Sequence, residues 1–475
     1  MVFSEPIFLF LFLPIALILY FIMPGMRSKN LVLTMLSLLF YAWGEPVWVA
    51  LLILTSLLHY CFGKIIARNQ GKQHAKHAVI TVVIVSLGLL AAFKYANFII
   101  ANINTLTGLN ISESKLTLPI GISFYTFQTL TYSIDVYRGN VNSQKSFINF
   151  LLFVSLFPQL IAGPILRYSD IETQLAARKT TLPELSGGIT RFLCGLGKKV
   201  LLANYAGAVA ERLLSGNSPT SHTVVGAWLG IVLFAFQIYF DFSGYSDMAI
   251  GLGKMFGFSY PENFRYPYMS KSITEFWRRW HISLGSFFRD YVYIPLGGNR
   301  KGLITQICNM LIVWALTGLW HGAGWSFVIW GLWSFVFLFV EKLIGETRLE
   351  KIPGFVRMPY AFIVVVIGWV FFYFTKMSDA VLAISTMFGN TPGGFVNSEV
   401  SLTLINSTPL IIICFLASSD VFVKIYRRFV PDTASSGTMS VMSTISTVIY
   451  NSIILALCTI SIMGSTFNPF IYFRF

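Results

Sequence analysis

Two histidines in apolar, tryptophan-rich surroundings are the residues of this chain best suited to chemistry. His321 ends an apolar run and is followed by glycines at 322 and 324, which allow a ligand to approach the backbone closely. An apolar setting disfavours imidazolium, so we expect a neutral ring. A neutral imidazole accepts a proton from a hydroxyl group and so serves as a general base. The alternative for His321 is a hydrogen-bonded packing residue.

The second histidine, His281, lies in a basic segment. Lys254–Lys301 holds eight Lys and Arg residues against three Asp and Glu residues, a net charge of +5, and it is rich in aromatic side chains. Cationic and aromatic groups together suit an anionic ligand with a ring system, such as the phosphates and adenine of coenzyme A. Arg278, Arg279 and Trp280 are therefore candidate donor-binding residues. Nucleic acid fits less well, because membrane spans flank the segment.

Part of this segment has the pattern of a helix with one apolar face. Apolar residues between Ile273 and Phe288 recur at helical spacing, and Ser272 and Thr274 are candidate N-cap residues. An alternative role for this helix is to lie at the membrane interface, with tryptophan at the headgroups and arginine reaching lipid phosphates. His281 falls at the edge of the apolar face, where we expect it to point inward.

A polar cluster interrupts the long apolar stretch that precedes the basic segment. Ionisable groups inside a span are costly, so they mark candidate functional positions. One hypothesis is that the cluster forms the polar wall of a channel or tunnel, and the alternative is hydrogen bonding between helices. The candidate residues are Gln237, Asp241, Ser243, Tyr245 and Asp247.

The composition shows which class of protein must position these residues. Of 475 residues, 55% are hydrophobic and 11% are charged, and the mean hydropathy is +0.69. A soluble domain has roughly 25% charged residues and could not hide so much apolar surface. The composition therefore excludes a soluble enzyme, a disordered chain and a secreted disulfide scaffold. The net charge of +14 fits basic residues held in cytoplasmic loops.

Apolar runs predict an all-α, multi-pass membrane protein with about 11 to 13 membrane elements. We predict one membrane-embedded domain over residues 1–475, with N-terminal helices over 1–115, a core over 116–345 and C-terminal helices over 346–475. His59 lies in the third run, and we expect it to be structural. The runs are Pro6–Met23, Leu31–Trp43, Val47–Gly63, Ala78–Ile99, Leu118–Tyr132, Phe147–Ile165, Gly188–Leu213, Val224–Met255, Leu303–Trp320, Trp325–Leu343, Tyr360–Phe374, Leu402–Ala417 and Ile445–Met463, with a weaker one at Ala380–Phe388.

The distribution of basic residues predicts the orientation of these runs. Lys64–His77 holds four Lys and Arg residues and no acid, so we place it in the cytoplasm. Strict alternation fails at Arg167–Lys179, and we expect the helix-breaking stretch Phe157–Pro164 to be re-entrant. The other predicted cytoplasmic segments are Met26–Asn30, Arg138–Lys145 and Lys424–Arg428, and the predicted external ones are the N-terminus, Gly44–Pro46, Asn102–Lys115 and Ser215–His222.

Most sequence motifs of known enzymes are missing, but one group of motifs is distinctive. Walker, HExxH, Rossmann and Gly-x-Ser-x-Gly patterns are absent, and no Cys or His spacing suits a metal. The chain resembles the membrane-bound O-acyltransferase (MBOAT) family, in the bacterial branch that includes the alginate O-acetylation membrane protein. The motifs that carry the resemblance are Leu118–Gln128, Ile134–Arg138, Phe157–Ile165, Asp241–Asp247, Phe276–His281, Tyr293–Gly298, Thr317–Gly322 and Phe470–Phe475, with Met1–Ser4 and Phe8–Pro14 at the start.

The resemblance implies a fold and a function. It implies a bundle of helices around a tunnel across a bacterial inner membrane, with His321 as the catalytic histidine and His281 as the second signature residue. Trp320, directly before His321, is a further candidate for donor binding or for the tunnel. It implies acetyl-CoA or another acyl thioester as donor substrate and no tightly bound cofactor. The acceptor would be an extracytoplasmic polysaccharide (an alginate-like exopolysaccharide, cellulose or peptidoglycan), reached directly or through a periplasmic esterase-like partner. The alternative is a transporter or flippase of an acyl carrier or lipid-linked sugar.

Overall fold

The computed structural model describes residues 1–215, 223–429, 441–464 and 470–471, and all regular structure in these ranges is helical. Most of the predicted external segment Ser215–His222, and residues 472–475 of the terminal motif, lie outside the described residues. The chain forms two compact units. Unit 1 comprises Met1–Phe192 and Ser246–Pro261, and unit 2 comprises Leu193–Tyr245 and Glu262–Phe475.

The predicted all-α, multi-pass membrane architecture is confirmed. In the described part of the chain, eight helices are long and apolar enough to cross a membrane. The sequence predicted more elements, because several apolar runs form helices that are too short for this criterion, among them Phe8–Ile22 and Met377–Met387. The eight are Val49–Arg68, Gln73–Lys94, Val224–Met255, Leu303–His321, Trp325–Ile344, Gly354–Tyr373, Ser398–Ala417 and Ser443–Met463.

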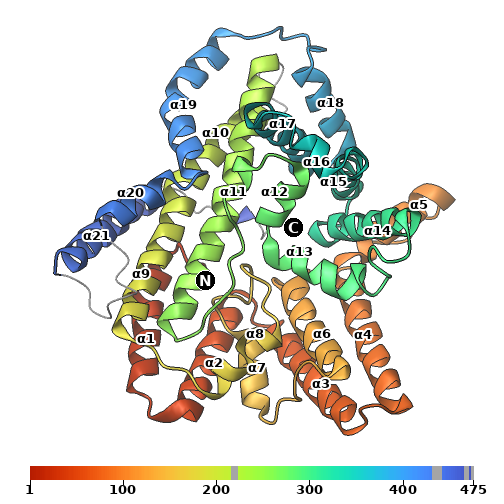
Figure 1. Cartoon of the computed structure of the whole chain (residues 1–475), viewed down its shortest axis with the longest axis vertical. Coiled ribbons are helices and arrows are strands. Elements are labelled where there is room, and N and C mark those ends of the chain that lie inside the picture. Colours follow the sequence, from red (N-terminus) through yellow and green to blue (C-terminus); the bar gives the residue numbers. More distant parts are fainter. Residues whose placement is uncertain (216–222, 430–440, 465–469, 472–475) are drawn as a thin grey trace. The chain divides into compact units, whose positions relative to one another are not determined.

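Unit 1 is built around a packed group of three helices, α3, α4 and α6 (Figure 1). His59 of α3 joins them: its ring nitrogens lie 2.7 Å from Ser133 Oγ of α6 and 2.8 Å from Ser86 Oγ of α4. This is the structural role that we predicted for His59. The helices of this unit are α1 (Leu13–Ile22), α2 (Gly25–Gly44), α3 (Val49–Arg68), α4 (Gln73–Lys94), α5 (Ala96–Thr107), α6 (Ile122–Arg138), α7 (Phe147–Ser155) and α8 (Tyr168–Ala176), with the start of α9 (Leu182–Gly197) and the end of α11 (Val224–Met255).

Two predicted runs of unit 1 are not single helices. The run Ala78–Ile99 breaks between α4 and α5, and the run Phe147–Ile165 is helical only to Ser155. The stretch Phe157–Pro164 has irregular backbone and is almost wholly buried in this unit. Buried protein surroundings are what irregular backbone at membrane depth requires. Its re-entrant topology stays a prediction.

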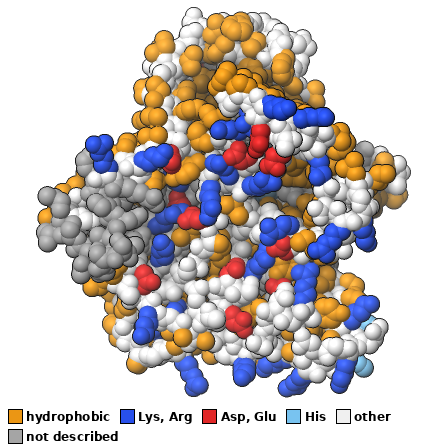
Figure 2. Space-filling view, in the orientation of Figure 1, with side chains coloured by type: hydrophobic (Ala, Val, Ile, Leu, Met, Phe, Trp, Pro, Cys, Tyr) orange, Lys and Arg blue, Asp and Glu red, His pale blue; other side chains and the backbone are white. Residues whose placement is uncertain are grey.

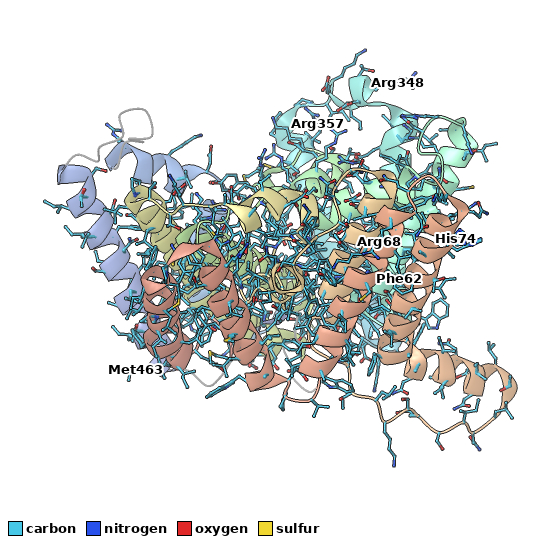
Figure 3. All side chains as sticks on the ribbon, turned by 90° about the horizontal axis from the view of Figure 1, so that it is seen from below. Phe62, Arg68, His74, Arg348, Arg357 and Met463 are labelled. Carbon is cyan, nitrogen blue, oxygen red and sulfur yellow. The ribbon has the colours of Figure 1, made fainter. Side chains whose placement is uncertain are left out.

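Basic side chains gather at one end of unit 1. Arg68 and His74 lie at the end where α3 meets α4, and α5 leaves the other end of α4 (Figure 3). Lys and Arg side chains are prominent over this end in the space-filling view (Figure 2). The cytoplasmic placement of Lys64–His77 stays a prediction.

Unit 2 is organised by close contacts between α14 and α15 and between α15 and α17. Glycines permit the first contact: a Cβ at Gly318 would lie 2.3 Å from Phe327 O, and one at Gly331 would lie 2.3 Å from Trp314 O. Besides the end of α9 and most of α11, its helices are α10 (Asn204–Leu214), α12 (Ile273–Arg279), α13 (Ile282–Phe288), α14 (Leu303–His321), α15 (Trp325–Ile344), α16 (Glu346–Leu349), α17 (Gly354–Tyr373), α18 (Met377–Met387), α19 (Ser398–Ala417), α20 (Val421–Phe429) and α21 (Val441–Met463).

Candidate active site

The predicted helix through the basic segment is broken at His281. Two short helices, α12 and α13, replace it, and His281 between them has φ 45° and ψ 54°, in the left-handed region (Figure 1). The backbone carbonyl of Asn263 stabilises this break by accepting a hydrogen bond from Ile282 N at 3.0 Å. Ser272 is the N-cap of α12, as predicted, whereas Thr274 lies inside the helix.

Asn263 also fixes the hydrogen on the His281 ring. Ser283 N donates to Asn263 Oδ1 at 3.1 Å, and a backbone N–H identifies that side-chain atom as an oxygen acceptor. Nδ1 of His281 lies 3.2 Å from the same oxygen, so it must carry hydrogen to bond there. The contact with Asn263 therefore favours the Nδ1–H tautomer, which leaves the lone pair on Nε2.

Burial keeps the His281 ring neutral. The residue is 2% exposed and lies against Phe242 and Trp320, with ring centroids 4.6 Å and 5.9 Å away. This apolar environment lowers the pKa of His281 to about 3, because imidazolium cannot be hydrated there. His281 thus points inward, as the apolar face predicted, and it is a hydrogen-bond acceptor at neutral pH.

His321 lies at the end of α14, in an aromatic enclosure. It is 5% exposed, and its ring centroid is 4.8 Å from Trp320, 4.9 Å from Trp330 and 5.2 Å from Phe372. The glycine that follows it is required by packing, since a Cβ at Gly322 would lie 2.2 Å from the Phe327 ring. The close packing of α14 on α15 therefore holds the imidazole in place.

Both histidines line one cavity of about 200 Å³ within unit 2. Trp320 contacts the rings of both. The walls are mainly aromatic and aliphatic, which suits an acyl group and disfavours bulk water. The lining residues are Trp277, Trp280, His281, Leu284, Gly285, Phe288, Arg289, Tyr293, Met310, Val313, Trp314, Thr317 and His321.

The two arginines that we predicted as donor contacts lie outside this lining. Arg278 is exposed and lies 3.9 Å from Glu346, and Arg279 pairs with Glu275 one helical turn earlier. Trp280, the third candidate, is 3% exposed and lines the cavity. The arginine among the lining residues is Arg289, which forms an ion pair with Asp290 at 2.7 Å.

The polar cluster of α11 forms contacts between helices. Asp241 forms a buried ion pair with Lys199 and accepts from Ile471 N at 2.8 Å. The ring of Tyr245 lies edge-on to Phe470, with centroids 4.9 Å apart. Ser243 is also buried, and the side chain of Gln237 lies so close to Gly207 of α10 that a Cβ there would be 2.4 Å from its Nε2.

Asp247 belongs to unit 1, where it forms an ion pair with Arg191. These contacts are the hydrogen-bonding alternative that we considered for the cluster, and none of its five residues lines the cavity. A role in a tunnel wall stays a prediction.

The sequence did not reveal several residues around the histidines. Asn263 lies 18 positions before His281, and no periodicity marks it. From the sequence, Trp314 and Trp330 could be recognised only as members of apolar runs. Only the break at His281 and the pairing of α14 with α15 bring these side chains together.

The structure thus has two buried histidines at one apolar cavity in an all-α membrane protein. The model of the MBOAT, membrane-bound O-acyltransferase family matches residues 139–378. The chain belongs to this family, and it is an O-acyltransferase and a multi-pass membrane protein.

The names of its relatives refer to different acceptors. The chain is 40% identical to a probable alginate O-acetylase of Pseudomonas putida over the full length of both proteins. It is 33% identical to a peptidoglycan O-acetyltransferase of Helicobacter pylori, over 82% of this chain and 80% of the relative. It is 30% identical to a teichoic acid D-alanyltransferase of Bacillus subtilis, over 47% of this chain and 60% of that protein.

Proposed function

We propose that this protein transfers acetyl groups from a cytoplasmic thioester donor to hydroxyl groups of an extracytoplasmic polysaccharide, directly or through a periplasmic partner protein. The observation that carries the proposal is the position of His281 and His321 on one apolar cavity. The relatives named alginate O-acetylase and peptidoglycan O-acetyltransferase support acetyl as the acyl group and a polysaccharide as the acceptor. The proposed location is the bacterial inner membrane.

His321 is the general base of the proposed reaction. Its imidazole takes the proton of the acceptor hydroxyl while the oxygen attacks the thioester carbonyl. The tetrahedral intermediate then expels the thiolate, which receives the proton from imidazolium. One ester bond forms, one thioester bond breaks, and the histidine returns to its neutral form. Exclusion of water by the aromatic walls prevents wasteful hydrolysis of the thioester.

His281 orients a substrate in this scheme. With Nδ1 bonded to Asn263, its Nε2 offers an acceptor for an O–H or N–H group, such as an amide of a pantetheine arm. A neutral ring in this tautomer cannot donate from Nε2, so it does not stabilise a developing oxyanion through that atom. Oxyanion stabilisation falls to another donor at the cavity.

The donor reaches the cavity past basic side chains. Arg289 lines the cavity and carries a charge that attracts the phosphates of coenzyme A or of a carrier-bound pantetheine. Arg278 lies on the exposed side of α12, where it adds to the positive potential that steers an anionic donor.

Purified protein supplied with radiolabelled acetyl-coenzyme A and a soluble polysaccharide tests the proposal. We expect release of free thiol and labelling of the polymer or of a partner protein, both lost in His321→Ala. Transport of intact acetyl-coenzyme A into sealed vesicles, without thiol release, would replace acyl transfer with the transporter hypothesis.

A further inference from the structure

A buried carboxylate on α15 holds the first turn of α12. Glu341 is 4% exposed, yet it lies near the end of an apolar helix. Its Oε1 accepts from Ile273 N at 2.6 Å, and its Oε2 accepts from Thr274 N at 2.8 Å and from Thr274 Oγ1 at 2.7 Å. A buried carboxylate with this many donors is well compensated.

These contacts complete the hydrogen bonding of the α12 N-terminus. The first N–H groups of a helix lack partners within it. Glu341 accepts hydrogen bonds from the backbone N–H groups of Ile273 and Thr274. Ser272 Oγ accepts one from Glu275 N at 3.0 Å. The negative carboxylate also interacts favourably with the positive end of the helix dipole. The start of α12 is therefore fixed to α15.

The same two helices meet again at the cavity. Trp277 of α12 lies 5.5 Å from Trp330 of α15, between ring centroids, and Trp330 lies 4.9 Å from His321. The helix α12 spans seven residues and leads through Trp280 directly to His281. The α12 backbone therefore connects the Glu341 contacts at its first turn to His281 just beyond its last turn.

We propose that Glu341 is a positioning residue: through α12 it sets the placement of His281 relative to His321. The inference rests on the proposed function for its catalytic consequence, but its structural consequence is measurable without activity. His281 has positive φ, a conformation that persists only where its surroundings enforce it. Asn263 holds the loop on one side of His281 and Glu341 holds the start of α12 on the other, so loss of the Glu341 contacts removes one of these restraints and exposes the ring more often.

Carbethoxylation of histidines by diethylpyrocarbonate, read by mass spectrometry, tests the proposal in the purified full-length protein. Glu341→Gln keeps the shape but places an amide N–H against backbone donors. We expect the labelling rate of His281 to rise about fivefold or more in this variant, with buried His59 of unit 1 still protected. Glu346→Gln is the matched control, because Glu346 is an exposed acid near α12 that pairs with Arg278. The control should leave both rates unchanged.

Wild-type labelling of His281 in Glu341→Gln would overturn the inference. Labelling of both His281 and His59 would indicate general unfolding. The variant Thr274→Val, which removes only the hydroxyl donor, then tests the inference. A rise in labelling at His281 alone supports the inference, and no rise overturns it. In the acyl-transfer assay, Glu341→Gln should lower kcat about 10- to 100-fold with KM for the donor within about twofold. An inactive wild-type protein would contradict the proposed function and leave the labelling result standing.

Discussion

Asn263 Oδ1 lies 3.2 Å from His281 Nδ1, and this contact determines which nitrogen of the buried ring carries hydrogen. The same oxygen also accepts from the backbone N–H and the hydroxyl of Ser283. Asn263 therefore links the tautomer of His281 to the fold of the loop around it. Changes at this residue have consequences for pH dependence.

Replacement of Asn263 by Asp should move the acid limb of activity to higher pH. In the native protein the pKa of His281 is lowered to about 3, so the ring stays neutral as the pH falls through the range where an ordinary histidine, at about 6.5, gains a proton. A carboxylate at this position stabilises imidazolium and raises that pKa. A pH profile of kcat compares Asn263→Asp with the wild type. Superimposable profiles would contradict the assignment of a neutral His281.

Enlargement of the cavity should broaden acyl selectivity. Met310 lines the cavity beside Trp314, and Met310→Ala removes a flexible apolar wall. One methylene in an apolar pocket is worth about 1–3 kcal/mol in discrimination. We expect the ratio of butyryl to acetyl transfer to rise about threefold or more. Competition between the two thioesters measures the ratio, and an unchanged ratio would place the acyl group elsewhere.

Charge reversal separates the arginine at the cavity from the exposed one. Arg289→Glu should raise KM for acetyl-coenzyme A about tenfold, and it should affect the uncharged thioester S-acetyl-N-acetylcysteamine much less. Arg278→Glu, on the solvent side of α12, should have a smaller effect that disappears in high salt. Equal losses with both donors in Arg289→Glu would argue against a phosphate contact.

The buried pair of Lys199 and Asp241 should matter for stability more than for chemistry. Asp241→Asn leaves a buried ammonium without its counterion, and breaking such a pair costs about 3–5 kcal/mol. We expect a clear drop in the thermal unfolding midpoint in detergent. The double variant Lys199→Met with Asp241→Leu should recover most of it. No recovery would point to a role for the charges beyond packing.

The sequence predicted the architecture better than the local geometry of the site. Apolar runs located long helices such as Val224–Met255, because span length and hydropathy are local properties. The sequence also identified His281 and His321 as candidates, since ionisable side chains among apolar ones can be recognised without a structure. The break of the predicted helix at His281 could not be predicted, because it depends on hydrogen bonds that Asn263 accepts from distant residues.

Long-range partners account for the other differences. In the sequence, Glu341 is an acid at the end of an apolar run. Its neighbours in the chain do not indicate that it contacts the N-terminus of α12. Asp241 had the pattern of a polar wall, but Lys199 neutralises it from another helix. Arg278 and Arg279 shared the charge of the segment, whereas the cavity is lined by Arg289. Such pairings depend on tertiary packing and leave no periodic trace.

The most direct measurement of the central claim is acetyl transfer by His321→Ala in intact cells and with purified protein. His74→Ala, an exposed histidine at the start of α4, is the matched control. With both variants present at wild-type levels in the membrane, we predict that His321→Ala abolishes polymer acetylation and thiol release, whereas His74→Ala retains both. Wild-type acetylation by His321→Ala would contradict the assignment of His321 as the general base.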